Sequence, residues 1–323
     1  MWPIFADPKT DFVFKRIFGT EPNKHLLIEL LNSLLELEGP YRIDEITFLT
    51  PEQKVPVSEL KLSIVDVKCQ DAAGNVYVVE MQVFNVEAFE KRVVYSVLLS
   101  SRMPRDVSKS YVMQIHSGDH YQDLTDVVGV TICDFQVWPE PPQPGGAPVP
   151  MLSRWRMQEQ HGGARGLPEV QYVFLELPKY TAGAAPVTTV DHWAYFFREA
   201  ENLEVIPPPL AADPYRSALE VARTASFTPG EWDAYDRAKI AEQDARGMLS
   251  LAERHGRAEG RAEGRAEGRA EGLAEGLRRN VVDVCGLLDI ELGPERRAQI
   301  ESLKAAELEA LLARLKRDRC WAD

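Results

Sequence analysis

The sequence KLSIVDVKCQDAAGNVYVVEMQV at residues 61–83 decides the fold, because it reads as two strands joined by a tight turn. Residues 61–70 and 76–83 are rich in β-branched side chains and flank the turn sequence DAAG. A three-residue loop that ends at Gly74 would place this glycine in the left-handed conformation that such loops require. The stretch therefore predicts an antiparallel hairpin.

The register of this hairpin brings two carboxylates together. Counting outward from the loop, Lys68 faces Val78 and Asp66 faces Glu80. Successive side chains of a strand point to opposite faces of the sheet, and this puts on one face Asp66, Lys68, Glu80 and Gln82. Two like charges directly opposite each other destabilise a strand pair, unless a shared proton, a lysine or a cation relieves them.

The paired carboxylates suit a divalent cation. Proteins bind Mg²⁺ through one or two carboxylates together with water and phosphate oxygens, so Asp66 and Glu80 fit a site for metal-assisted phosphodiester hydrolysis. The alternative is an ordinary solvated charged face on which Lys68 is the counter-ion. A slip of the register by one residue would also separate the two acids.

The rest of the chain supplies helices and further strands. Helical periodicity predicts a leucine-rich helix over 22–37 and a second helix over 86–103. The chain after Pro209 is mostly helical in pattern. Strands are predicted over 43–49, 110–116, 127–133, 151–157 and 170–177, and the proline-rich 139–150 predicts an exposed loop. This order predicts an α/β (α+β) fold with a mixed central sheet flanked by helices and a helical C-terminal extension.

Composition places the chain among globular proteins. Of its 323 residues, 45% are hydrophobic and 27% are charged. No run of 18 apolar residues predicts a membrane span, the N-terminus does not read as a secretory signal, and the four cysteines contain no CxxC pair, so we expect a reduced, cytoplasmic protein. The net charge of −13 argues against a typical nucleic-acid binder, although a bound cation changes the local balance.

A repeat occupies residues 257–272, which are four copies of Arg-Ala-Glu-Gly. On a helix, Arg and Glu two residues apart cannot form the i,i+3 or i,i+4 pairs that stabilise isolated helices, and each Gly costs about 1 kcal/mol relative to Ala. The repeat predicts a flexible or marginally helical spacer. Alternatively, it is a stem for self-association, in which the Arg stripe of one chain faces the Glu stripe of another. A leucine-bearing helix over 294–319 is a further candidate for docking or dimerisation.

Several segments together resemble one known family. They are DPKTDFVFKRIFG at 7–19, IVDV at 64–67, VVEMQ at 78–82 and FEKRVVYS at 89–96. The chain resembles the recombination-promoting nuclease/putative transposase (Rpn) family of the PD-(D/E)XK nuclease superfamily, over roughly residues 4–275. YVMQIHSGDHY at 111–121, VFLELPKY at 173–180 and the C-terminal repeat extend the resemblance. It implies a restriction-endonuclease-like fold.

The resemblance also implies site residues. Asp66 and Glu80 would bind Mg²⁺, with Mn²⁺ as an alternative, and the backbone carbonyl of Met81 would join them. The third position of the motif is normally Lys and orients the attacking water. Here that residue is Gln82, which has no positive charge, so Lys68 on the same predicted face would supply the charge.

Three residues outside the hairpin are further candidates. Lys15 is a second source of positive charge and, with Arg92 on the helix after the hairpin, a candidate contact for DNA phosphates. An ion pair with neighbouring glutamates is the alternative for Arg92. Asp11 is either an accessory acid of the site, a helix cap or the partner of Lys15 or Arg16 in a salt bridge.

These observations predict a Mg²⁺-dependent DNA endonuclease of low sequence specificity, active in recombination or in mobile-element activity. The alternative is a catalytically inactive DNA-binding or assembly module that self-associates through its C-terminal repeat, and RNA is a third candidate substrate. The expected organisation is a nuclease-like domain over 1–205, a helical extension over 206–255, a repeat spacer over 256–276 and a small helical segment over 277–323.

Overall fold

The computed structural model describes residues 3–49, 52–53, 63–64, 66–85, 89–98, 124–141, 145–160, 162–163 and 165–321. The chain divides into two compact units, residues 1–240 and 241–323. The division falls within one long helix, α6 (Pro229–Leu287).

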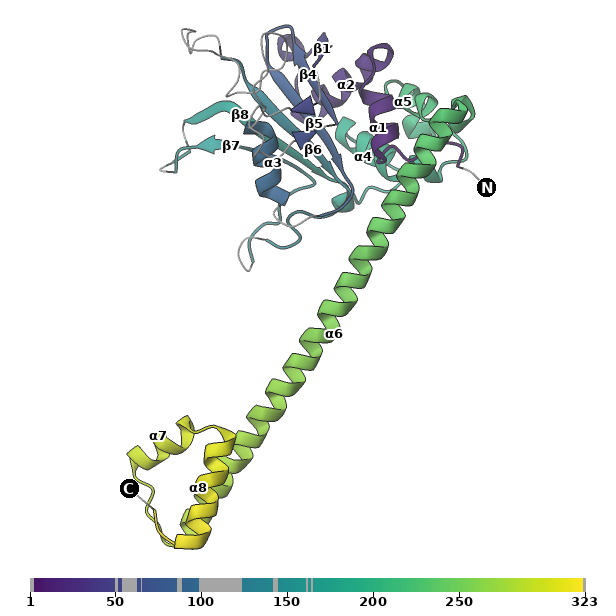
Figure 1. Cartoon of the computed structure of the whole chain (residues 1–323). Coiled ribbons are helices and arrows are strands. Elements are labelled where there is room, and N and C mark those ends of the chain that lie inside the picture. Colours follow the sequence, from purple (N-terminus) through teal and green to yellow (C-terminus); the bar gives the residue numbers. More distant parts are fainter. Residues whose placement is uncertain are drawn as a thin grey trace. The chain divides into compact units, whose positions relative to one another are not determined.

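Within the described residues of the first unit, six strands form one mixed sheet in the order β1-β4-β5-β6-β8-β7 (Figure 1). The strands β5, β6 and β8 are parallel, while β1, β4 and β7 pair with their neighbours in antiparallel fashion. The bounds are β1 Ile46–Phe48, β4 Val67–Asp71, β5 Val76–Gln82, β6 Val127–Cys133, β7 Leu152–Gln158 and β8 Gly166–Glu176. The prediction of a mixed sheet is confirmed, and the predicted strand at 110–116 lies outside the described residues.

The hairpin of β4 and β5 has the predicted register. Lys68 pairs with Val78, and the neighbouring pairs keep the same alignment. The Asp71 N–H donates to the Asn75 carbonyl at 3.0 Å to close the loop, and Gly74 adopts a φ of +94°. A side chain at Gly74 would also lie 2.9 Å from Thr125, so both the conformation and the space require glycine here.

The first strand of the hairpin is shorter than predicted. The expectation of one strand over 61–70 is wrong, because β3 (Ser63–Ile64) pairs with β2 (Glu52–Gln53) in a separate two-stranded sheet. Asp66 lies in a bend between β3 and β4. Its side chain accepts a hydrogen bond from a backbone N–H of β5. This N–H is therefore not paired with a backbone carbonyl of the neighbouring strand, and the regular ladder ends here.

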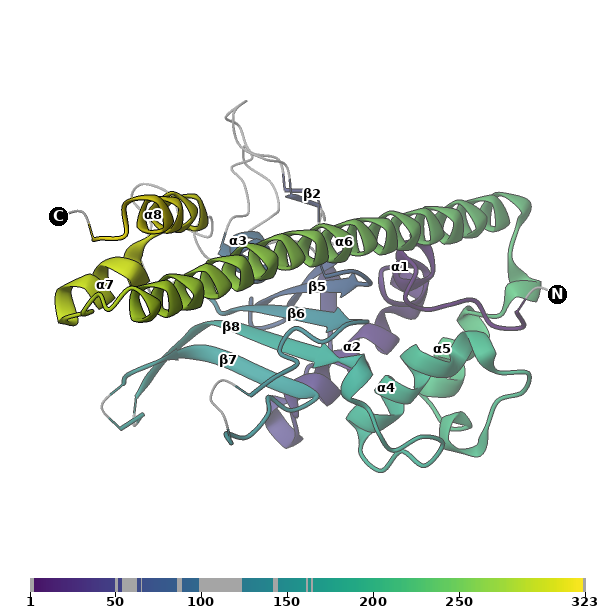
Figure 2. The ribbon, with the colours of Figure 1, turned by 90° about the horizontal axis from the view of Figure 1, so that it is seen from below.

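One face of the sheet carries the main core. It is covered by α1 (Asp11–Phe18), α2 (Lys24–Leu35), α4 (Thr189–Glu199) and α5 (Tyr215–Val221), which lie together on this side in Figure 2. The leucines of α2 recur at helical spacing and are buried against strand residues such as Val67 and Val79. Sequence analysis did not identify α4, although its Thr188–Asp191 capping box is a recognisable start signal.

The opposite face of the sheet is covered in part by α3 (Phe89–Leu98) (Figure 2). Phe89 and Val93 are buried in a second cluster with Cys133 and Phe174. Phe89 and Val93 are four residues apart, so both side chains lie on the side of α3 that faces the sheet. Consequently the polar side chains that β5 directs to this face lie beneath or beside a helix.

The second unit is built from the C-terminal part of α6, α7 (Pro294–Ser302) and α8 (Ala305–Asp318). Their apolar side chains form a separate small core that includes Val281, Cys285, Ile300 and Leu308. No helix among the described residues has the length and apolar character that would be needed to cross a membrane.

The Arg-Ala-Glu-Gly repeat lies inside α6, so it is a continuous helix and not a break. Both ends of α6 are anchored by packing: Tyr235 is buried in the core of the first unit and Val281 in that of the second. Nucleation is the costly step of helix formation, whereas extension adds one hydrogen bond for each residue. Anchored ends therefore offset the weak intrinsic propensity of the glycine-containing middle.

Candidate active site

Asp66 is attached to β5 at the residue that follows Glu80. Its Oδ2 accepts a hydrogen bond from the backbone N–H of Met81 at 2.8 Å. Asp66 is not itself paired in the ladder, and the last observed pair next to it is Val67 with Val79. The structure thus brings the two predicted acids to neighbouring positions, but through a side-chain hydrogen bond and not through direct strand pairing.

The carboxylate of Glu80 is enclosed, and the described residues supply it with no close partner. Glu80 is 7% exposed, on the β5 face that α3 partly covers. Within the described part of the chain, no side chain or backbone group donates a hydrogen bond to it or forms an ion pair with it. Burial raises the pKa of Glu80, and the positive charge of Arg92 opposes that shift. A buried carboxylate without a donor is costly, so Glu80 is stabilised by taking up a proton or by binding a cation.

The environment of Asp66 also disfavours its charged form. Burial raises the pKa of Asp66 to about 7, the hydrogen bond from Met81 lowers it, the nearby Asp11 raises it and Lys15 lowers it. Lys15 Nζ lies 3.7 Å from Asp66 Oδ1 and also forms a salt bridge with Asp11 on the preceding turn of α1. Of the alternatives left open for Asp11, the salt bridge with Lys15 is therefore observed, whereas the N-cap of α1 is Thr10. The salt bridge places both residues beside Asp66.

The available oxygen atoms fit a hard divalent cation. In an antiparallel pair, the N–H and C=O of one residue point to the same neighbour, so the Met81 carbonyl lies on the edge of β5 that Asp66 occupies. Two carboxylates and one carbonyl are ligands that Mg²⁺ accepts while keeping several waters. Among the described residues no group of three His, Cys, Asp or Glu side chains could hold a metal, which leaves this mixed set as the candidate.

Lys68 is enclosed more completely than sequence analysis suggested. It is 1% exposed on the same face of the hairpin as Glu80, and burial lowers its pKa to about 8. The prediction that Lys68 and Glu80 share a face agrees with the register of β4 and β5. With almost no accessible surface, however, its ammonium group is poorly placed to meet a phosphate of DNA.

Gln82 and Arg92 contact each other at the end of β5. Arg92 Nη2 donates to Gln82 Oε1 at 2.7 Å, and Gln82 Nε2 donates to the Phe84 carbonyl at 3.1 Å. Arg92 is exposed on α3, whereas Gln82 is half-buried. Of the two glutamates expected as alternative partners for Arg92, Glu87 lies outside the described residues, and no ion pair with Glu90 is recorded among them; the recorded partner is the amide of Gln82.

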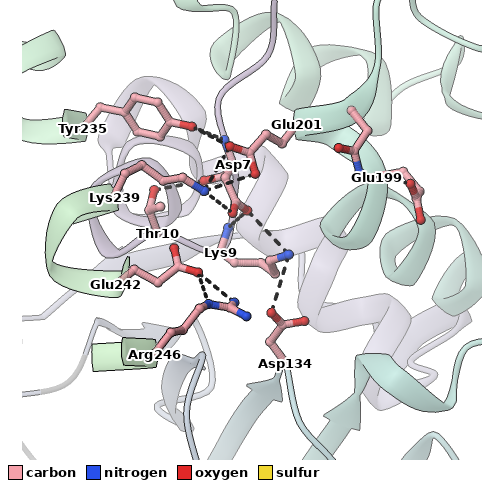
Figure 3. Close-up of polar contacts among 11 residues, drawn as sticks. Asp7, Lys9, Thr10, Asp134, Glu199, Glu201, Tyr235, Lys239, Glu242 and Arg246 are labelled. Carbon is pink, nitrogen blue, oxygen red and sulfur yellow. Dashed lines mark hydrogen bonds and ion pairs between the residues drawn. The ribbon is translucent and has the colours of Figure 1, made fainter. Parts of the chain in front are cut away.

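Sequence analysis missed a buried charged network that begins next to the site, shown in Figure 3. Asp134 follows β6 directly, its N–H donates to the Gln82 carbonyl at 2.9 Å, and its carboxylate lies 3.5 Å from Lys9 Nζ. Lys9 in turn lies 3.9 Å from Asp7. An acid immediately after an apolar strand was the available signal, because strand ends commonly carry functional side chains.

The same network attaches the N-terminal segment to the start of α6 (Figure 3). Asp7 is 2% exposed, its N–H donates to the hydroxyl of Tyr235 at 3.1 Å, and its Oδ2 lies 3.1 Å from Lys239 Nζ. Glu201 Oε1 lies 3.0 Å from the same ammonium. Although burial lowers the pKa of Lys239, the charges of Asp7 and Glu201 raise it above its ordinary value.

A groove of about 570 Å³ runs along the exposed side of α1, next to Asp66. Lys15 and Arg16 from α1 and Arg237 from α6 contribute positive charge, while Asp11 and Glu231 contribute negative charge. Arg16 is held in place by a salt bridge with Glu231 and by a 3.1 Å hydrogen bond to the Val221 carbonyl. Lys15 is the basic residue of this groove that also reaches the carboxylate pair.

Comparison with known proteins gives one match. A family model described as PD-(D/E)XK nuclease family transposase matches residues 8–252. The matched range contains the whole hairpin, α1 and α3, and thus the residues around Asp66 and Glu80, whereas Asp7 of the charged network lies just before it. No curated protein and no solved structure matches the chain.

Proposed function

The chain belongs to the family of PD-(D/E)XK nuclease family transposases, whose restriction-endonuclease-like α/β fold it has, and on this basis we propose that it is a Mg²⁺-dependent DNA endonuclease of low sequence specificity. The observation that supports this proposal most strongly is the pair formed by Asp66 and Glu80. One acid is fixed to the N–H of Met81, and the other is buried without a donor among the described residues.

In the proposed reaction, the oxygen of a water molecule forms a bond to phosphorus. The phosphorus–oxygen bond to one sugar breaks, and that sugar oxygen takes up a proton. Asp66, Glu80 and the Met81 carbonyl would hold Mg²⁺, or Mn²⁺ in its place. When bound, the cation would supply Lewis-acid stabilisation of phosphate charge and a more acidic water.

The residues around the carboxylates have supporting roles in this proposal. Lys15 would contact a DNA phosphate at the α1 groove and keep Asp66 oriented, since it lies 3.7 Å from that carboxylate. Asp11 would limit the mobility of Lys15 through their salt bridge. Lys68 would act as a buried positive charge beneath the hairpin and not as a direct phosphate ligand, because it is 1% exposed.

Low specificity follows from the kind of contact that these side chains offer. Lysine and arginine near the carboxylates would meet phosphate oxygens, which position DNA without reporting its sequence. The net charge of −13 also disfavours a large non-specific footprint. We therefore propose that the protein contacts DNA over a small surface and that its affinity for DNA depends on the bound cation.

Cleavage of supercoiled plasmid tests the proposed function. The wild-type chain should nick plasmid in Mg²⁺ or Mn²⁺ and lose this activity in EDTA, whereas Asp66→Asn and Glu80→Gln should not nick it. Glu38→Gln is a matched control, because Glu38 is an exposed carboxylate outside the site. Nicking that persists in both site variants would exclude the assignment. Structured RNA, included as a second substrate, tests the RNA alternative.

The repeat favours a second candidate function, assembly through self-association. Its residues are exposed along α6, and a Cβ added at its glycines would meet no atom within 4 Å. Among the described residues, Arg261, Arg265 and Arg269 have no ion-pair partner. Arginines at i,i+4 repel one another along a helix. The repeat carries as many Glu as Arg, so a second copy would supply the opposite charges.

Metal binding distinguishes the two candidates. An assembly module without catalytic activity would bind neither Mg²⁺ nor Mn²⁺ at Asp66. Calorimetry would then give the same result for the wild type and for Asp66→Asn. An endonuclease would bind the cation through Asp66 and could also self-associate, so assembly by itself does not argue against catalysis.

A further inference from the structure

The end of β5 contains an amide whose two polar atoms are both engaged. Gln82 Oε1 accepts from Arg92, and Gln82 Nε2 donates to the Phe84 carbonyl. The two bonds require the same orientation of the amide, since only the oxygen can accept and only the nitrogen can donate. Gln82 is therefore held in one orientation, as an acceptor for the guanidinium of Arg92.

The guanidinium held in this way lies on the same face of the sheet as Glu80. Glu80 and Gln82 alternate with Met81 and so point to the same face of β5, the face on which α3 packs through Phe89 and Val93. Arg92 bonds to the side chain two residues along β5 from Glu80, so its charge lies on the same side of the sheet as that carboxylate. Arg92 remains exposed to solvent, so its other N–H groups are accessible to a ligand.

Hydrolysis of a phosphodiester needs positive charge at this place. Negative charge is shared among the phosphate oxygens in the transition state, and fixed cations stabilise it. Two carboxylates already contribute negative charge here, and Gln82 contributes none. Lys68 is enclosed, and Lys15 lies on α1, where Asp11 and Asp66 share its charge. In the described part of the chain, Arg92 forms no ion pair that would occupy its charge.

We propose that Gln82 and Arg92 act as one unit, in which the Gln82 amide positions the guanidinium beside Glu80 and Arg92 contacts the scissile phosphate. This inference rests on the proposed function and assigns to Arg92 the charge that Gln82 lacks. A planar guanidinium suits the role, because it can donate one N–H to Gln82 and two others to phosphate oxygens.

A merely structural Arg92 is the competing explanation, since its bond to Gln82 also connects α3 to β5. The structural role and the phosphate-binding role of Arg92 predict different results when a positive charge is introduced at another residue. A lysine at residue 82 would carry an ammonium group on the same face of β5, beside Glu80. It would restore the charge without restoring the Arg92–Gln82 hydrogen bond.

The test compares R92Q, R92K and the double variant Q82K/R92Q with the wild-type chain. K91Q is the matched control, because Lys91 is the exposed neighbour on α3 and is not part of the site. Each is assayed for plasmid nicking in Mg²⁺ and for binding of a duplex oligonucleotide in Ca²⁺ by fluorescence anisotropy. Thermal unfolding of each variant confirms that it is folded.

We expect R92Q to lower kcat about 100-fold, as loss of a donor to transition-state charge does in other enzymes. R92K should retain part of the rate, K91Q should match the wild type, and Q82K/R92Q should regain at least about tenfold over R92Q. An unchanged kcat and affinity in R92Q, or a loss that Q82K does not restore, would overturn the inference. If the wild-type chain does not cut DNA, the proposed function fails, and the binding comparison alone decides the role of Arg92.

Discussion

The carboxylate of Asp66 accepts a 2.8 Å hydrogen bond from the backbone N–H of Met81, the residue next to Glu80. This bond connects the bend before β4 to the middle of the sheet. It fixes the position of one acid relative to the strand that carries the other. The predictions about metal binding depend on this relationship.

Asp66→Asn and Glu80→Gln should abolish Mg²⁺ binding while leaving the fold intact. The amide oxygen of the substituted asparagine would still accept the Met81 N–H, but a neutral amide is a poor ligand for a hard cation. Isothermal titration calorimetry with MgCl₂ should give a binding isotherm for the wild type and for Glu38→Gln, and none for the two site variants. Equal affinity in all four proteins would contradict the proposed ligands.

Without metal, the charge of Asp66 should cost stability as the pH rises. The carboxyl is protonated in both folded and unfolded states below its ordinary pKa of 3.8, and ionised in both above its folded pKa of about 7. The cost of burial therefore develops between these values and is complete above pH 7. In EDTA, the stability advantage of Asp66→Asn over wild type should grow from pH 5 to pH 8 by up to about 3 kcal/mol, as measured by urea unfolding. An advantage independent of pH would be inconsistent with this assignment.

Mg²⁺ affinity should fall as the medium becomes more acidic. Below the folded pKa of Asp66, about 7, a ligand carboxyl must lose its proton before it can bind the cation. We expect the apparent affinity to decrease by up to about tenfold for each pH unit below 7. Calorimetry at pH 6 in two buffers of different ionisation enthalpy should also detect proton release. Affinity that stays constant from pH 6 to pH 8 would argue against Asp66 as a ligand.

Lys239→Met should destabilise the first unit. Asp7 would remain buried after losing a partner at 3.1 Å, with its second cation, Lys9, 3.9 Å away. Removing one member of a buried ion pair typically costs about 3–5 kcal/mol. The double variant Asp7→Asn/Lys239→Met should recover part of the loss, since it leaves no uncompensated charge. Chemical denaturation of the wild type, both single variants and the double variant measures the coupling, and additive effects would show that the two residues act independently.

The repeat should mediate association through opposite charges. Replacing Arg257, Arg261, Arg265 and Arg269 with Glu gives an all-acidic stem, and replacing the four repeat glutamates with Arg gives an all-basic one. Each full-length variant should be monomeric by light scattering, whereas the wild type and a mixture of the two variants should form oligomers. A monomeric wild type would contradict this proposal, as would an oligomer that survives either charge swap.

Local patterns in the sequence were sufficient for the central hairpin. The β-branched and apolar residues of the two strands and the turn chemistry around Gly74 determine which residues pair, and both depend only on neighbours in the chain. The same richness in β-branched residues located β6 at Val127–Cys133. Resemblance to a known family implied the same two carboxylates as metal ligands and added the Met81 carbonyl, and the family match agrees with the family assignment.

Tertiary structure alone decided how the site is completed. Asp66 leaves the ladder to bind Met81, Lys68 is enclosed, and Arg92 meets Gln82 only because α3 packs on that face of the sheet. The Asp7–Lys239 pair joins residues 232 positions apart. Periodicity specifies the face of an element on which a side chain lies, but contacts between distant elements depend on how their surfaces pack, which no local pattern encodes.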